Sequence, residues 1–231
     1  MEKKEELKKQ AAEKAVEEIQ SGMIIGLGTG STVYYALLKI SDLLKNGKLE
    51  NVFGIPSSNQ TEKLANEMGI PLTTFEEHQK IDVTIDGADE IDKYLNLIKG
   101  GGGALLREKI LAQASKKLVI VADESKLSPK LGTRWAVPIE VIKFAYPLEM
   151  EFVKTLAGEP ELRMYDNLNE PVITDEGNYI LDVNFGTIRN PFELASKLES
   201  RAGIVEHGLF LHLAAKVIVA KEEGIKIFEK K

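Results

Sequence analysis

The densest collection of potentially reactive side chains in this 231-residue chain lies in one short stretch. Asp86 and Asp89 are followed by Lys99, by four consecutive glycines at 100–103, and then by Glu108. Four glycines in a row are costly in conformational entropy, so we expect them where the backbone must approach another group closely or take unusual φ values. Acids and a lysine beside such a run indicate a site for a small polar molecule, which we expect to be anionic.

Glu108 is the strongest candidate for a general base. It falls in a predicted helix over residues 104–115, and at helical spacing its neighbours are small or apolar: Ala104, Leu105, Leu111 and Ala112. A carboxylate on such a face should be partly desolvated, which raises its pKa towards the range useful for a general base. The alternative is an ordinary surface glutamate on an exposed helix, which is the commoner position for this residue type.

The elements predicted before residue 128 alternate between strands and helices, which is typical of a mostly parallel sheet with helices on both faces. The predicted strands end in small polar loops at residues 28–32, 57–58, 86–89 and 123–126. In sheets of this kind, ligands bind outside the carboxyl ends of the strands. We therefore expect these loops, although distant in the sequence, to meet at one edge of the sheet.

The glycine-rich segment 26–32 joins a predicted strand to a predicted helix. Backbone N–H groups at a helix N-terminus, together with Ser and Thr hydroxyls, can bind an anion. The segment is neither a dinucleotide fingerprint, whose third glycine would fall on Ser31, nor a P-loop, which needs a following lysine. A tight turn that caps the helix is the simpler interpretation. Beside the other polar loops, we favour phosphate binding.

The other charged residues of these loops allow more than one interpretation. Asp86 and Asp89 could form a solvated acidic turn, bind a hard cation, or bond to sugar hydroxyls and move a hydroxyl proton. The three histidines form no ligand pair at helical spacing, and we expect no metal and no cofactor. Lys99 and Lys126 could be surface lysines, but their predicted position at the same edge favours pairing with a phosphate or an oxyanion.

The pattern changes from about residue 129. Strands are predicted at 134–141, 161–165 and 179–183 and from 204, with helices at 147–156 and 191–200. This β-α-β-β-α-β order matches a ferredoxin-like unit. The fold class is therefore α/β, a Rossmann-like parallel sheet with a small inserted α+β ferredoxin-like domain. We expect a catalytic domain of residues 1–128 and 208–231, including a hairpin over 217–228, and an inserted domain of residues 129–207.

Composition excludes several classes of function. The formal net charge of −6 argues against a nucleic-acid-binding surface. The absence of cysteine excludes disulfides and cysteine nucleophiles and suits a reducing cytoplasm. The charged N-terminus does not have the pattern of a signal peptide, and no apolar run approaches the ~20 residues of a membrane span. A soluble cytoplasmic protein without nucleic-acid or membrane partners is expected.

The chain resembles the ribose-5-phosphate isomerase family, type A, in several motifs that occur in the family's order: residues 26–32, 86–90, 99–104, 107–109, 123–126, 172–182 and 208–210. The resemblance covers nearly the whole chain. It implies interconversion of ribose 5-phosphate and ribulose 5-phosphate in the non-oxidative pentose phosphate pathway, without a metal, by a homodimer or homotetramer. Another sugar-phosphate isomerase, a lactonase, or a non-enzymatic sugar-phosphate sensor are the alternatives.

The resemblance also implies roles for individual residues. Glu108 would be the catalytic base, and Asp86 or Asp89, with Lys99, would assist ring opening. The residues implied to contact the substrate are Thr29, Gly30, Ser31, Thr32, Asp86, Gly87, Ala88, Asp89, Lys99, Gly100, Gly101, Gly102 and Lys126. The loop that begins at Ser57 and Ser58 departs from the family pattern, which leaves their role open.

Overall fold

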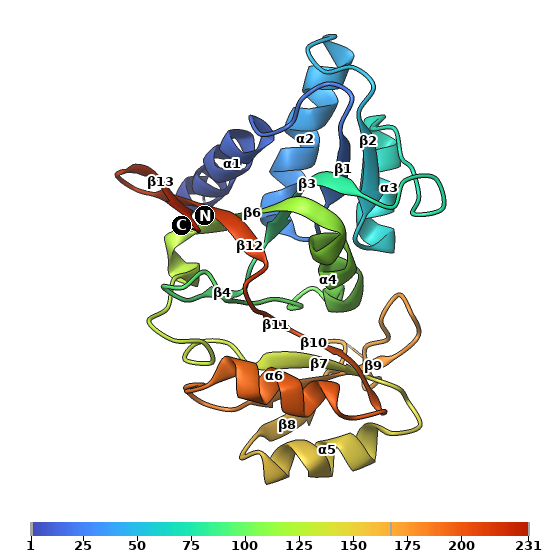
Figure 1. Cartoon of the computed structure of the whole chain (residues 1–231), viewed down its shortest axis with the longest axis vertical. Coiled ribbons are helices and arrows are strands. Elements are labelled where there is room, and N and C mark those ends of the chain that lie inside the picture. The colour runs from blue at the N-terminus through green and yellow to red at the C-terminus, as the bar shows by residue number, and fades with distance from the viewer. Residues whose placement is uncertain (1, 167, 231) are drawn as a thin grey trace. The chain divides into compact units, whose positions relative to one another are not determined.

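The computed structural model describes residues 2–166 and 168–230, with side chains from residue 5 onward, and it divides into two compact units (Figure 1). Unit 1 comprises Met1–Ala88, Arg107–Leu127 and His212–Lys231. Unit 2 comprises Asp89–Leu106 and Ser128–Leu211. Residues 89–106, which we expected in the first domain, therefore group with the second unit.

Unit 1 contains a six-stranded sheet. Its strands are β1 (Ile24–Leu27), β2 (Phe53–Pro56), β3 (Ile81–Gly87), β6 (Ser115–Asp123), β12 (Ala214–Lys221) and β13 (Gly224–Glu229). Their order across the sheet is β13-β12-β6-β3-β1-β2, and every pair is parallel except the β12–β13 hairpin. The parallel sheet and the C-terminal hairpin that joins it are both confirmed. Parallel pairing brings the carboxyl ends of β1, β2, β3 and β6 to the same edge.

Helices cover both faces of this sheet (Figure 1). They are α1 (Glu2–Val16), α2 (Ser31–Lys45), α3 (Asn59–Met68) and α4 (Leu105–Ala114). Residues of α1, α2 and α3 share one apolar core with Ile25 of β1, whereas Leu111 of α4 belongs to a cluster against which Ile24 packs. Successive residues of a strand point to opposite faces, so α4 lies on the face away from the other helices.

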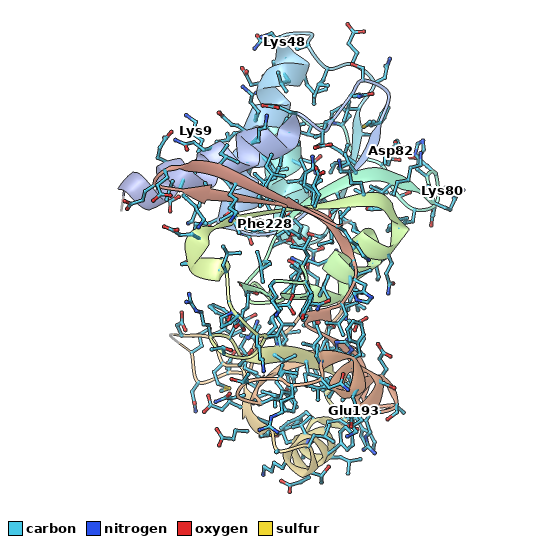
Figure 2. All side chains as sticks on the ribbon, turned by 60° about the vertical axis from the view of Figure 1, so that its left-hand side comes forward. Lys9, Lys48, Lys80, Asp82, Glu193 and Phe228 are labelled. Atoms are coloured by element: carbon cyan, nitrogen blue, oxygen red, sulfur yellow. The ribbon has the colours of Figure 1, made fainter. Side chains whose placement is uncertain are left out.

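The amino ends of the parallel strands are joined by a carboxylate. Asp82, labelled in Figure 2, accepts the Ile24 N–H at 2.9 Å and forms an ion pair with Lys116 at 2.7 Å. The side-chain hydrogen bond from Lys116 is the main cause that lowers the pKa of Asp82. The first residues of β1, β3 and β6 are thus tied together at the end of the sheet opposite the polar loops.

Unit 2 is built on an antiparallel sheet of four strands: β7 (Val137–Val141), β8 (Glu159–Leu162), β9 (Tyr179–Asn184) and β10 (Ile204–His207). Their order is β10-β7-β9-β8. The helices α5 (Tyr146–Thr155) and α6 (Pro191–Glu199) pack on the sheet through a core that includes Val153 and Leu198. The predicted β-α-β-β-α-β order of this part of the chain is confirmed.

A second, smaller sheet in unit 2 explains why residues 89–106 belong there. It consists of β4 (Glu90–Ile91), β5 (Leu97–Ile98) and β11 (Leu209–Phe210), in the order β11-β5-β4. The Lys99 N–H also bonds to the Gly208 carbonyl at 2.9 Å. Because these strands have only two residues each, they carry no periodic signal that the sequence could have revealed.

Two predicted strands have different bounds in the structure. The strand predicted over 134–141 begins only at Val137, because the buried carboxylate of Glu90 binds the preceding backbone and so takes donors that a strand would need. The strand predicted over 161–165 is β8, which ends at Leu162, and Met164 forms only an isolated bridge. Among the described residues, no helix has the length and apolar character needed to cross a membrane.

Candidate active site

The loop after β1 is joined to the end of β3 by a buried carboxylate. Asp86, only 1% exposed, accepts the Thr29 N–H at 3.2 Å and the Gly87 N–H at 2.7 Å through Oδ1. The Gly28 N–H also donates to the Ile85 carbonyl at 3.0 Å. Two of the predicted substrate-binding loops therefore meet in unit 1.

Gly28 lets these two loops approach each other. A Cβ atom at position 28 would lie 2.3 Å from Asp86 Oδ1 and 2.7 Å from the Asp86 Cα. Real Cβ atoms do not come so close to other heavy atoms. The glycine that follows the β1 strand is thus required by the position of Asp86, not by the turn itself.

Four hydroxyl groups bring the loop after β2 into the same region. Thr29 Oγ1 lies 2.7 Å from Ser57 Oγ, 2.9 Å from Ser58 Oγ and 3.1 Å from Thr61 Oγ1. Thr61 Oγ1 donates to the Gly28 carbonyl at 2.9 Å. Ser57, Ser58 and Thr61 are buried, so this hydroxyl cluster is a fixed part of unit 1 and not a solvated loop.

The first turns of α2 and α3 differ. Ser58 caps α3 by accepting the Thr61 N–H at 3.0 Å. Gly30 occupies the corresponding position before α2, and no side chain caps that helix. The helix begins at Ser31, which is exposed, followed by Thr32, which is half-buried. An N-terminus without a side-chain cap leaves backbone N–H groups for an anion.

Glu108 lies on α4 and is buried, with only 4% of its surface exposed. Its four helical neighbours are buried as well: Ala104, Leu105, Leu111 and Ala112. The low exposure contradicts the alternative of an ordinary surface glutamate. Burial of the carboxylate is the property on which its assignment as a base depends.

The residue before Glu108 joins α4 to the hydroxyl cluster. Arg107 donates through Nη1 to Asn59 Oδ1 at 2.9 Å, and Asn59 follows Ser58 directly at the start of α3. A series of contacts within unit 1 thus runs from Asp86 through Thr29 and Ser58 to the helix that carries Glu108. The structure therefore brings together three of the predicted loops and the start of α4.

The loop after β6 has its own local structure. Asp123 is buried at the end of β6 and accepts the Ser125 N–H at 2.9 Å and the Ser125 hydroxyl. These bonds cap a short 3₁₀ helix, η1 (Glu124–Lys126), whose last residue, Lys126, is half-buried. The parallel sheet places this loop at the same edge as the loops after β1 and β3.

The remaining predicted residues belong to unit 2. Asp89 is half-buried, and its Oδ2 accepts the Gly101 N–H at 2.8 Å. The chain turns at Gly100 (φ +99°), and the Gly103 N–H bonds to the Gly100 carbonyl at 3.0 Å. A Cβ at position 101 would lie 2.8 Å from Asp89 Oδ1, which explains a glycine there.

Lys99 is held at the end of β5. It is 2% exposed, and its Nζ lies 5.4 Å from the centroid of the Phe210 ring on β11. A buried cation over an aromatic face is stabilised by the ring quadrupole. Of the predicted glycines of unit 2, Gly100 is buried, whereas Gly101 and Gly102 are exposed. In unit 1, Gly87 and Ala88 are half-buried and Gly30 is exposed.

Other buried acids of unit 2 have structural partners. Glu90 accepts the N–H groups of residues 132–135 at 2.9–3.3 Å. Glu149 forms a two-point pair with Arg201. Burial raises the pKa of Glu140, which nevertheless accepts hydrogen bonds from Asn178 and Thr174. These acids support the fold of unit 2, so their burial needs no catalytic explanation.

Sequence reasoning missed several residues of these two regions. The role of Ser57 and Ser58 was left open and Thr61 was given no role in the site, although a hydroxyl-rich segment after a predicted strand was a visible signal. Arg163, which bonds to the carbonyls of Gly100 and Gly101, had no local signal because the contact spans more than 60 positions.

The parallel sheet of unit 1 has buried carboxylates, hydroxyls and an uncapped helix N-terminus at its carboxyl edge. These features are typical of α/β proteins that bind small ligands beyond the ends of their strands. The chain belongs to the ribose 5-phosphate isomerase A (phosphoriboisomerase A) family, whose sequence pattern matches residues 53–224.

Individual relatives extend this match over nearly the whole chain. A ribose-5-phosphate isomerase A from Desulfatibacillum aliphaticivorans is 55% identical over 220 residues, which is 95% of each protein. A solved D-ribose-5-phosphate isomerase in complex with phospho-erythronic acid superposes with a TM-score of 0.96 at 42% identity, covering 98% of this chain and 99% of that one. The Plasmodium falciparum ribose 5-phosphate isomerase gives a TM-score of 0.95 at 45% identity, with the same coverage.

Proposed function

We propose that this chain is an aldose–ketose isomerase that interconverts D-ribose 5-phosphate and D-ribulose 5-phosphate in the non-oxidative pentose phosphate pathway. Family membership over nearly the full length supports the substrate and the reaction class. The observation that carries the proposal is the buried Glu108, on a helix that Arg107 joins to the hydroxyl cluster and so to Asp86.

The reaction requires one proton to move between neighbouring carbons. In the open-chain aldose, Glu108 removes the proton from C2, and the electrons form an enediolate whose negative charge develops on the C1 oxygen. The protonated Glu108 then returns the proton to C1, while the hydroxyl proton of C2 moves to the C1 oxygen, so that C2 becomes the ketone and C1 becomes a CH2OH group. A single carboxylate can serve both carbons because they are adjacent.

The charged groups beside Glu108 in the sequence have separate roles in this proposal. Asp86 or Asp89, with Lys99, moves the proton of the C1 hydroxyl to the ring oxygen as the bond between C1 and that oxygen breaks and the cyclic sugar opens. Lys99 and the N–H groups of Gly100 and Gly102 stabilise the oxyanion of the enediolate, since the Gly101 N–H donates to Asp89. Preorganised donors aimed at a developing negative charge are among the largest contributions to enzymatic catalysis.

The phosphate is assigned to the start of α2. Gly30, Ser31 and Thr32 offer backbone N–H groups where no side chain caps the helix, and Lys126 adds a positive charge from the loop after β6. Gly87 and Ala88, which separate the two acids in the sequence, are assigned contacts with the substrate. A relative that was solved with phospho-erythronic acid, a phosphorylated four-carbon acid, supports a phosphorylated sugar as the ligand.

The assembly and the location follow from other observations. We assign a homodimer or homotetramer in the cytoplasm, without nucleic-acid or membrane partners. The exposed apolar side chains of Phe144 (95%) and Leu148 (61%) in unit 2 support contact between subunits, since such residues gain from burial. The lack of cysteine suits a reducing compartment.

A turnover assay with the purified chain tests the function. Ribose 5-phosphate is supplied with an excess of a metal chelator, and ribulose 5-phosphate is measured; a parallel reaction contains hexose phosphates. We expect conversion of the pentose phosphate only, at a rate that the chelator does not change. Binding without conversion would support a sugar-phosphate sensor instead, and conversion of a hexose phosphate would support a different isomerase. Either result would contradict the proposal.

A further inference from the structure

One side chain of unit 2 contacts the glycine run from the opposite side to Asp89. Arg163 follows β8, and its Nη1 donates to the carbonyl of Gly100 at 2.9 Å and to that of Gly101 at 3.2 Å. No local sequence pattern marks this arginine. Its contacts connect the antiparallel sheet of unit 2 with the segment that carries Lys99 and the glycines.

The contacts of Arg163 and Asp89 fall on the same peptide group. The carbonyl of Gly100 and the N–H of Gly101 belong to one peptide bond, and in a planar trans peptide they point in opposite directions. Arg163 holds the carbonyl side, whereas Asp89 Oδ2 accepts the N–H at 2.8 Å. If this peptide rotated, both hydrogen bonds would be lost together.

Glycine alone offers no resistance to such a rotation. Gly100 has φ of +99°, and residues 100–103 have no side chains that could hold the backbone in place. An external contact is therefore needed to keep the Gly101 N–H directed at Asp89. The main chain of Asp89 is fixed independently, since its N–H bonds to the Ile98 carbonyl at 2.9 Å.

Arg163 is itself held rigidly. Its Nε donates to Asp182 Oδ2 at 2.7 Å and its Nη2 donates to Asp182 Oδ1, which is a two-point pair between a guanidinium and a carboxylate. Asp182 lies on β9 within the four-stranded sheet. This pairing fixes the plane of the guanidinium, so that the remaining Nη1 group points at the two carbonyls.

We propose that Arg163 is a positioning residue for the isomerase: by holding the Gly100–Gly101 peptide, it orients the carboxylate of Asp89 for proton transfer. The proposal rests on the proposed function, in which Asp89 takes part in opening the sugar ring. Arg163 contacts neither the base nor, in this account, the substrate. Its effect reaches the reaction through one peptide group.

A second arginine–carboxylate pair in the same unit provides a matched control. Arg201 donates through Nε and Nη2 to Glu149 at 2.9 and 3.1 Å, and Glu149 is 1% exposed. This pair joins the segment after α6 to α5, and neither residue forms a hydrogen bond with the glycine run in the described part of the chain. If Arg163 only stabilises unit 2, removal of either arginine should have the same consequences.

The test compares Arg163→Met with Arg201→Met in the full chain, using kcat, KM and melting temperature. For Arg163→Met we expect kcat to fall about 10- to 100-fold with less change in KM, because small displacements of catalytic groups have effects of that size. For Arg201→Met we expect kcat within about twofold of wild type, as for a change remote from the site. Arg163→Lys should recover little, since an ammonium lacks the planar fork.

A double variant distinguishes positioning from general stabilisation. In an Asp89→Asn background, Arg163→Met should reduce kcat by no more than about twofold further. Both changes disable the same function, which is proton transfer by a correctly oriented Asp89 carboxylate. If the two losses multiplied, or if Arg201→Met reduced kcat as much as Arg163→Met, the proposal would be overturned. A wild-type chain without turnover would refute the proposed function, whatever the variants do.

Hydrogen exchange tests the proposal independently of enzymatic activity. With ¹⁵N-labelled glycine, hydrogen exchange of the Gly101 amide should accelerate at least about tenfold in Arg163→Met and stay near wild type in Arg201→Met. Should Arg163→Met not fold, Asp182→Asn replaces it, since that variant keeps the arginine but releases the guanidinium. Unchanged exchange at Gly101 in the folded variant would contradict the proposal.

Discussion

The two ends of the parallel sheet in unit 1 are both rich in charged and polar residues, but they use them differently. At the amino ends, carboxylates pair with lysines: Asp82 with Lys116, and Glu18 with Lys117 and Lys216. At the carboxyl ends, Asp86 accepts backbone N–H groups. Acids at the amino edge are paired with flexible lysine side chains, whereas Asp86 at the carboxyl edge is held by hydrogen bonds from the main chain.

The pKa directions at the amino edge fit this description. Side-chain hydrogen bonds from Lys117 and Lys216 lower the pKa of Glu18, with that from Lys117 the larger cause. Lys216 forms side-chain hydrogen bonds with Glu18 and Glu229, and these bonds raise its pKa, with that to Glu18 the larger cause. Glu18 and Lys216 are therefore held in their charged forms, and they serve as a structural ion pair. A group that must gain and lose a proton during a reaction requires a different environment.

The largest difference between the edges should appear when the buried glutamate of α4 is neutralised. We expect Glu108→Gln to reduce kcat by about 10²- to 10⁴-fold or more, because a positioned base contributes a factor of that size. The substitution nearly preserves shape, so the melting temperature should change little. Steady-state kinetics with ribose 5-phosphate and thermal unfolding provide the two measurements.

Glu140→Gln is the matched control for that variant. Glu140 is also a buried glutamate, and burial raises the pKa of its carboxyl, but its partners are Thr174 and Asn178 in unit 2. We expect Glu140→Gln to retain kcat within about twofold, as for a change that touches no catalytic group. Near-wild-type turnover of Glu108→Gln would show that the base lies elsewhere.

The close approach of two loops at the carboxyl edge gives a second, smaller prediction. In Gly28→Ala the new Cβ would lie 2.3 Å from Asp86 Oδ1, so we expect a loss of about 1–3 kcal/mol of stability from overpacking. In Gly87→Ala the nearest atom, the Thr29 carbonyl oxygen, is 4.0 Å away, so we expect a change within about 0.5 kcal/mol. Denaturant unfolding compares the two, and equal losses would contradict the assigned contact.

The smallest effect is expected at the amino edge. Lys116 lowers the pKa of Asp82, so this pair stabilises the fold above the unfolded pKa of about 3.9 and loses that contribution as pH falls through the lower folded pKa. Asp82→Asn should cost less than about 1 kcal/mol at pH 7, as for other surface pairs, and leave kcat unchanged. Thermal unfolding at several pH values checks whether the difference in stability between Asp82→Asn and wild type becomes smaller below pH 4. A stability difference that became larger there would contradict the assigned Asp82–Lys116 pair.

The parallel sheet and its polar edge could be predicted because their signals are local. Each strand is an apolar run that ends in a polar loop, and parallel pairing then places the loops together whatever their distance in the sequence. The burial of Glu108 was predictable from its four helical neighbours for the same reason. The hydroxyls of Ser57 and Ser58 were visible, but the neighbours that give them a role lie nearly 30 residues away in the loop after β1.

The features that could not be predicted depend on distant pairings. The strands β4, β5 and β11 have two residues each, and β5 pairs not only with the nearby β4 but also with β11, across more than 100 positions. This pairing places residues 89–106 in unit 2, contrary to the expected boundary. The contact of Arg163 with Gly100 likewise has no counterpart in local periodicity.

A crystal structure of the chain with phospho-erythronic acid bound tests the central claim most directly. We expect the phosphate at the first turn of α2, beside Ser31 and Thr32, and the carboxylate of Glu108 about 3 Å from the end of the ligand that corresponds to C1 and C2 of the sugar. A ligand bound at the amino edge beside Asp82, or one whose carboxylate end lies out of reach of Glu108, would contradict it.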